Sequence, residues 1–230
     1  MARARRSGQT ARRDWTSPRS ADPQRCAACA RPGRGMCAEC LRAAALLRCA
    51  DGAPERLAPG VLALAAFSYD GVVARAIRSV KTPGRHAAAA PLGDLLWAEM
   101  TPRLGAALRW PRTWVPSTSR RFRARGAEIP RLLAGGDARC LLRRVRQVGE
   151  QKARAGHERR SGPCGDFRCD QPVPYGVVMV DDVRTTGATA RAAAVALRSA
   201  GARRVLVITL AAVRNPNEPP ANSSAEPYYA

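Results

Sequence analysis

The chain has 230 residues, of which 46% are hydrophobic, and this is enough for one domain with a buried core and a small appendage. It carries 39 basic and 18 acidic residues, a net charge of +21, and only Lys81 and Lys152 are lysines, so almost all of the positive charge is arginine. No stretch of about 18 apolar residues is present and no apolar segment follows the N-terminal arginines, which argues against a membrane span or a secretory signal and predicts a cytoplasmic protein.

The first 50 residues combine a basic tail with a cluster of cysteines. Residues 1–23 are rich in Arg, Ser and Pro without a hydrophobic period, and they predict a disordered basic tail. Residues 24–50 contain two C-x-x-C pairs, whose members are Cys26, Cys29, Cys37 and Cys40. Two such pairs can complete a tetrahedron of thiolates around Zn²⁺, although the seven residues between the pairs form a shorter loop than is usual. We therefore predict a small module with structural zinc, and the alternatives are a redox dithiol or unpaired thiols.

Four segments predict the first half of an α/β domain that covers residues 58–213. Residues 61–67 form an apolar run typical of a strand, and residues 72–80 have apolar side chains at helical spacing. Residues 87–100 predict a second helix, and residues 113–115 predict a short strand that stops at a proline.

The middle of the chain is less regular and strongly basic. Residues 112–160 include 14 basic and 4 acidic side chains, and the pairs Leu132-Leu133 and Leu141-Leu142 predict short helical pieces. The charge reflects either a compositional bias or a surface that binds phosphates or nucleic acid. Residues 161–174, rich in Gly, Pro and Cys, predict a loop, and residues 214–230 predict a loose C-terminal tail.

The C-terminal part of the domain has the pattern of a strand–helix–strand unit. Residues 177–180 are a continuous apolar run, which is typical of a strand buried on both faces. Residues 188–200 predict an Ala-rich helix that ends at Gly201, and residues 205–210 predict a second buried strand. Such a unit implies two parallel strands, and the ligands of open α/β sheets bind at the carboxyl ends of the strands. The sequence therefore predicts an α/β fold with a binding site directly after Val180.

The residues between this strand and this helix combine two kinds of polar group. Asp181 and Asp182 follow the strand, and a loop of small residues and hydroxyls then leads into the helix through Thr185, Thr186, Gly187, Ala188 and Thr189. The free N–H groups and the dipole at a helix N-terminus favour a phosphate. Carboxylates accept hydrogen bonds from vicinal hydroxyls and help to hold Mg²⁺, so the segment predicts a site for a ribose 5-phosphate. The alternatives are a plain nucleotide-binding turn, or a Thr-rich helix cap beside two solvated aspartates.

Residues 177–189 as a whole resemble the signature with which type I phosphoribosyltransferases bind 5-phosphoribosyl-1-pyrophosphate (PRPP). That signature is four apolar residues, two acidic residues and then T-T-G-x-T, and this segment matches it at every position. The resemblance implies the type I phosphoribosyltransferase fold, a parallel sheet flanked by helices. It also implies that Asp181 and Asp182 are the catalytic acidic pair on the ribose hydroxyls and the Mg²⁺ of the donor, and that residues 185–189 surround the 5-phosphate.

The order of motifs along the chain is similar to that of the ComF family, the competence-associated phosphoribosyltransferase-like proteins. Besides a four-cysteine module ahead of such a domain, the shared segments are residues 67–71 with Ile77 and Lys81, Val115-Pro116 with Arg120, Arg121, Arg125 and Gly126, and residues 142–146 with Gln151. The resemblance implies that residues 116–126 form the pyrophosphate loop, with Pro116, Arg120 and Arg121 as its candidate residues. The chain departs from the family after Gly126, where Ala127-Glu128-Ile129 replace Phe-Asn-Gln.

Two functions are compatible with these patterns. An active enzyme would displace pyrophosphate from C1 of the ribose through an oxocarbenium-like transition state, which requires positioning and charge stabilisation. Arg120 and Arg121 would then hold the leaving pyrophosphate, or else they are solvated surface charges. The alternative is a non-catalytic PRPP- or nucleotide-binding accessory protein for DNA uptake or recombination, in which residues 112–160 contact single-stranded DNA. Only Trp114 and Phe122 are large aromatic residues in that segment, so it has no obvious platform for base stacking.

Overall fold

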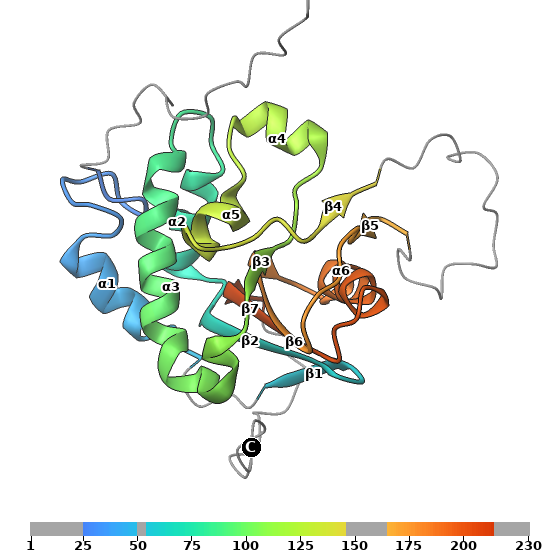
Figure 1. Ribbon diagram of the computed structural model, residues 1–230. Helices are drawn as coiled ribbons and strands as arrows, with labels where there is room; N and C mark the ends of the chain where they lie inside the picture. Colours follow the sequence, from blue (N-terminus) through green and yellow to red (C-terminus); the bar gives the residue numbers. More distant parts are fainter. Residues whose placement is uncertain (1–24, 50–53, 146–164, 214–230) are drawn as a thin grey trace, which may run out of the picture.

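The computed structural model describes residues 25–49, 54–145 and 165–213 (Figure 1). The tails predicted at residues 1–23 and 214–230 lie outside these ranges, as does the segment 146–164. The described chain is an α/β structure whose five-stranded sheet has the order β1-β2-β7-β6-β3. The β1–β2 pair is antiparallel, and the other three pairs are parallel. In this order the strands span Glu55–Ala58, Val61–Ser68, Arg204–Ala212, Gly176–Arg184 and Arg112–Trp114.

Helices cover both faces of the sheet (Figure 1). One face packs against α1 (Ala38–Ala45), α2 (Gly71–Val80), α3 (Ala89–Leu104) and α5 (Ile129–Ala134). The other face packs against α6 (Ala188–Ser199) and the small hairpin of β4 (Arg143–Arg144) and β5 (Phe167–Arg168). Short 3-10 turns at His86–Ala88 and Gly105–Arg109 flank α3, and α4 (Ser119–Arg125) follows β3. Within the described ranges, no helix has both the length and the apolar character of a membrane span.

Alternate side chains of the central strands point into two separate cores, because successive residues of a strand face opposite sides of a sheet. The core under α2, α3 and α5 receives Val178, Val180, Leu206 and Ile208. The core under α6 receives Val177, Met179, Val205 and Val207. Both faces of β6 and β7 are therefore buried, which explains why the sequence shows continuous apolar runs in place of an alternating pattern.

Most of the predicted elements are confirmed. The strands predicted at residues 61–67, 113–115, 177–180 and 205–210 lie in β2, β3, β6 and β7, and the helices predicted at residues 72–80, 87–100 and 188–200 lie in α2, α3 and α6. Leu132-Leu133 lies in α5, as predicted. The described part of the predicted loop at residues 161–174 contains the two-residue strand β5.

The helix predicted at Leu141-Leu142 is wrong. Both leucines are buried in the core under α6, but they lie in extended chain that leads into β4. The N–H of Arg139 donates to the carbonyl of Arg112 at 2.8 Å, and the N–H of Leu141 donates to Oγ1 of Thr113 at 3.3 Å. These bonds to β3 replace the bonds that a helix would make within the segment, so tertiary contacts override the local pattern.

The four-cysteine segment shares its core with the α/β domain. Cys26, Met36 and Cys40 belong to the same buried cluster as the side chains beneath α2 and α3. At Gly35, which has a φ of +68°, a Cβ atom would lie 2.6 Å from Cβ of Pro91 on α3. Such a close backbone approach requires glycine, and it shows that the segment is docked tightly against α3.

Candidate functional site

Strand β6 is longer than the sequence predicts. The apolar run predicted a strand over residues 177–180, whereas β6 continues to Arg184. The reason is the neighbouring β7, which extends to Ala212 and pairs with Arg184 there. Asp181 and Asp182 therefore lie within the strand, and the sheet constrains their backbone.

A pocket lies between the end of β6 and the start of α6. It contains about 290 Å³ of space, part of it open to solvent. The predicted ligand-binding residues on its wall are Asp181, Thr185, Thr186, Gly187, Ala188 and Thr189. Thr209, which pairs with Asp181 from β7, also lines the pocket. Asp181 and residues 185–189, which we call the threonine loop, thus line the same pocket.

The start of α6, which is positively polarised, lies on the wall of this pocket. Gly187 is the N-cap residue and has a left-handed φ of +70°. The N–H of Ala188 donates to Oγ1 of Thr186 at 3.4 Å, and the guanidinium of Arg191 donates to the Thr186 carbonyl at 2.5 Å. The helix dipole and the charge of Arg191 both add positive potential at the start of α6.

The edge strand β1, which the sequence did not predict, supports the threonine loop from outside. Glu55 forms an ion pair with Arg184, the last residue of β6. A Cβ atom on Gly187 would lie 3.0 Å from Cδ2 of Leu57. The positive φ therefore favours glycine at this position, and a side chain there would also press against Leu57 of β1.

The two adjacent carboxylates have different partners. Oδ2 of Asp182 lies 2.8 Å from Nζ of Lys81, which follows α2, and both side chains are largely buried. Oδ1 of Asp181 accepts a hydrogen bond of 2.8 Å from the N–H of Asp182. Asp181 faces the pocket, whereas Asp182 is held by an ion pair, so the two residues can play different parts in binding.

The environment favours the protonated form of Asp181. Burial of the carboxyl group and the negative charge of Asp182 raise its pKa to about 8. The N–H of Asp182 and the positive charges of Lys81 and Arg144 oppose this shift. A metal ion or a set of hydroxyl donors in the pocket would favour the ionised carboxylate, so a ligand of that kind would bind with release of a proton.

The predicted pyrophosphate loop is only partly brought to this site. β3 pairs with β6 at Trp114 and Val180, so Pro116 follows at the same edge of the sheet. Arg120 and Arg121 lie on α4, a seven-residue helix that buries no side chain, and both are exposed. The structure therefore places Pro116 at the same edge of the sheet as the pocket, and it leaves the two arginines on the surface.

The departure from the family pattern at residues 127–129 has a structural role. Ala127 and Ile129 are buried in the core under α3 and α5. Oε1 of Glu128 accepts a hydrogen bond of 2.7 Å from the N–H of Ser117. These three residues hold the loop after β3 against the domain.

Arg144 lies near the site, although it was not among the site residues predicted from the sequence. Its Nε donates to the carbonyl of Pro116 at 3.2 Å, and its charge is close enough to lower the pKa of Asp181. The signal was present in residues 142–146, which follow the pattern L-x-R-x-R, but that pattern specifies two arginines, Arg144 and Arg146, and does not say which of them lies near the site.

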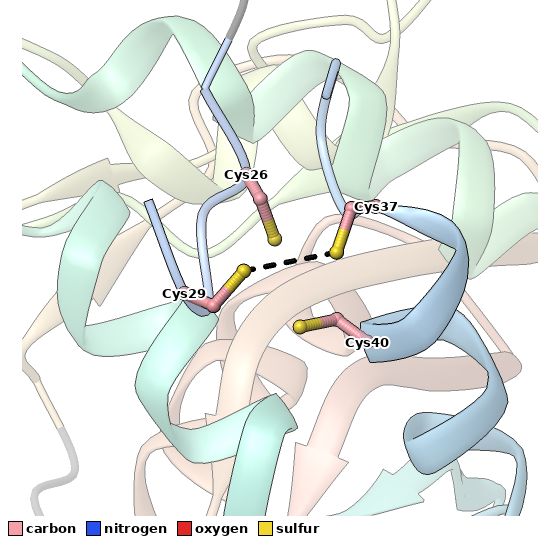
Figure 2. A group of neighbouring side chains, drawn as sticks. All are labelled: Cys26, Cys29, Cys37 and Cys40. Carbon is pink, nitrogen blue, oxygen red and sulfur yellow. Dashed lines mark hydrogen bonds between the residues drawn. The ribbon is translucent and has the colours of Figure 1, made fainter. Parts of the chain in front are cut away.

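The four cysteines predicted as metal ligands come together (Figure 2). Cys26 and Cys29 come from the turn before α1, Cys37 is the N-cap residue of α1, and Cys40 lies in its first turn. Their sulfur atoms all lie within 4.8 Å of one another, and the Sγ atoms of Cys29 and Cys37 are 3.7 Å apart. Four thiols in this arrangement could bind a metal such as zinc.

The ionisation of the four thiols is linked. The backbone N–H and the guanidinium of Arg31 lower the pKa of Cys29 to about 6. Burial raises the pKa of Cys26, but backbone hydrogen bonds from Cys37, Cys29 and Ala28 outweigh it and leave the pKa lowered. Burial and the neighbouring sulfur atoms raise the pKa of Cys40. A divalent cation among the sulfurs would favour the thiolate form of all four.

Comparison with models of known protein families finds no match to this chain. Comparison with curated proteins also finds no match. The likeness of residues 177–189 to a phosphoribosyltransferase signature therefore remains a prediction from the sequence.

The raised pKa of Asp181 predicts a pH-dependent stability. The native carboxyl keeps its proton up to about pH 8, whereas the unfolded one loses it near pH ~4. Between these values the native state binds more protons, so the contribution of Asp181 to stability is greatest at low pH and is lost as the pH rises to about 8. We expect the wild type's free energy of unfolding, minus that of Asp181→Asn, to decrease as the pH rises over this range. The decrease should be at most about 1.4 kcal/mol per pH unit.

Urea unfolding at several pH values between 5 and about 9 measures this difference. Asp94→Asn, which removes an exposed carboxylate on α3, is the control and should show no such slope. A wild-type minus Asp181→Asn difference that is independent of pH would contradict the prediction.

Proposed function

We propose that the chain is a phosphoribosyltransferase of the type I fold, which binds PRPP and transfers its phosphoribosyl group with release of pyrophosphate. The observation that carries the proposal is the pocket in which Asp181 and residues 185–189 lie together. A phosphate monoester suits the threonine loop and the start of α6, and a vicinal diol suits the carboxylate beside it. PRPP presents both groups on one ribose ring.

Different residues of this site would bind different parts of PRPP. Thr185, Thr186 and Thr189, together with backbone N–H groups at the start of α6, would bind the 5-phosphate. Asp181 and Asp182 would accept hydrogen bonds from the ribose hydroxyls and orient C1 toward the acceptor. Carboxylate oxygens are ligands that Mg²⁺ prefers, so the same pair fits a Mg²⁺ ion that arrives with the donor. That ion, when bound, supplies positive charge for the diphosphate.

Binding of PRPP can be measured by calorimetry with Mg²⁺ present. We expect Asp181→Asn and Asp182→Asn to weaken binding by about ten- to a hundredfold each, since a hydrogen bond to a charged group contributes roughly 1.5–3 kcal/mol. Thr189→Val, which keeps the shape and removes a hydroxyl, should weaken it by up to about tenfold. A screen for pyrophosphate release with ammonia, amines and nucleobases then identifies the acceptor.

The matched control is again Asp94→Asn on α3, which should bind PRPP as the wild type does. If PRPP does not bind to the wild type, or if the three pocket variants bind it as tightly as the control, the phosphoribosyl proposal is wrong. If PRPP binds but no acceptor promotes pyrophosphate release, a non-catalytic PRPP-binding protein is favoured.

We further propose that zinc holds the four-cysteine segment. We expect about one zinc per chain in freshly purified, reduced protein, and its loss in Cys37→Ser. Because the segment shares its core with α2 and α3, the variant should also melt at a lower temperature. Cys140→Ser, which changes an exposed cysteine outside the cluster, should keep both the metal and the melting temperature. Wild-type protein without stoichiometric zinc would contradict the proposal.

The exposed arginines of α4 favour a second candidate function, the binding of single-stranded DNA. Arg120, Arg121 and Arg123 are all exposed on this short helix. We expect DNA affinity to fall steeply with salt, and replacement of the three by Gln to reduce the salt dependence by up to about three charges. The control removes the same charge elsewhere, at the exposed residues Arg42, Arg75 and Arg203. Equal effects of the two triple variants would show that only net charge matters.

A further inference from the structure

The two adjacent aspartates of β6 lie on opposite faces of the sheet, because successive side chains of a strand alternate between its faces. Asp181 has the orientation of Met179, which points into the core under α6, and it lines the pocket beside the start of that helix. Asp182 has the orientation of Val180, which points into the core under α2 and α3. The described residues that line the pocket accordingly include Asp181 but not Asp182.

Lys81 holds Asp182 on the α2 side of the sheet. This lysine is the C-cap residue of α2, a helix that is fixed against the sheet by buried side chains such as Val73, Ile77 and Val80. Nζ of Lys81 lies 2.8 Å from Oδ2 of Asp182, and the two side chains are only 23% and 13% exposed. The C-terminal end of a helix also favours a cation. The ion pair therefore joins two side chains whose positions are set by a helix and a strand.

An ion pair in this position competes with a metal ion for the acidic pair. A divalent cation binds carboxylates through their oxygens and their negative charge, and Lys81 already supplies a positive charge to Asp182. The carboxyl group of Asp181 is left on the other face of the sheet, in the pocket. One carboxylate holds Mg²⁺ poorly, since this ion gives up its water reluctantly and usually needs substrate phosphates as further ligands. A metal ion would therefore have to arrive with oxygen ligands of its own.

We propose that Lys81 is a positioning residue that keeps the acidic pair free of divalent cations until the phosphoribosyl donor brings one. The inference rests on the proposed function, in which Mg²⁺ enters with the donor, and it gives a reason why the ion does not enter alone. Without Lys81, Asp182 would be a largely buried carboxylate without its cation, which is costly. A Mg²⁺ ion could then take the place of the ammonium group. The Lys81–Asp182 pair thus makes the donor and the metal bind together.

The experiment titrates the full-length chain with Mg²⁺ alone, in a calorimeter and without any donor. We expect Lys81→Met to bind Mg²⁺ at least about tenfold more tightly than the wild type, since a positive charge beside the carboxylate has been removed. Lys81→Arg keeps the charge and should behave as the wild type does. The double variant Lys81→Met/Asp182→Asn should lose the gain. The matched control is Arg48→Met, which removes a cation from the Arg48–Glu99 pair between α1 and α3 and should leave the Mg²⁺ affinity unchanged.

A gain in affinity cannot come from a weakened fold, so it separates positioning from mere structural support. Equal Mg²⁺ affinity in the wild type and Lys81→Met would overturn the inference. So would an equal gain in Arg48→Met, which would show an effect of net charge, or a gain that persists in the double variant, which would place the cation elsewhere. Lys81→Gln provides the same comparison if the Met variant melts well below the wild type. Titration of the wild type with PRPP tests the proposed function separately, so the two failures are distinguishable.

Discussion

The parallel pairing of β6 with β3 on one side and β7 on the other is the constraint on which the candidate site depends. Because β6 is buried on both faces, its position is fixed by two cores and by hydrogen bonds along both edges. The strand brings Asp181 to the pocket and places the start of α6 beyond it. The same pairing brings the loop after β3 to the neighbouring position. One strand therefore orders a carboxylate, a helix N-terminus and an arginine-bearing region around a single edge of the sheet.

The charges at this edge come from parts of the chain that are far apart in sequence. Asp181 and Asp182 are adjacent like charges that would destabilise the strand end if both were ionised without partners. Lys81, from the end of α2, neutralises Asp182 at 2.8 Å. Arg144, from β4, lies close enough to Asp181 to act on its carboxyl group. A proton on Asp181 removes the remaining repulsion between Asp181 and Asp182. In the site without a ligand, the two negative charges are thus offset by the Lys81–Asp182 ion pair and by the proton on Asp181. A ligand that brings cations or hydroxyl groups can displace this proton.

The sequence predicted the elements that depend on local pattern and missed those that depend on distant contacts. The apolar runs of β6 and β7 and the C-x-x-C spacing are properties of neighbouring residues, and they led to the right strands and the right sulfur cluster. The extension of β6 to Arg184 needs β7 beside it. The extended form of Leu141-Leu142 needs β3. Likewise, the position of Arg144 near the site depends on contacts with residues 116, 166 and 167.

The described arginines near the sheet edge differ in how far they are buried. Arg144 is half-buried, and its guanidinium is held by contacts with Pro116, Asp166 and Phe167. The arginines of α4 have the opposite character, since they are exposed and the helix buries none of its residues. Exposed guanidinium groups bind through long-range attraction that salt screens, and a half-buried one binds through short contacts that salt screens much less. The salt dependence of a bound anion would therefore distinguish contacts with the exposed arginines of α4, for which it is steep, from contacts with half-buried arginines, for which it is shallow.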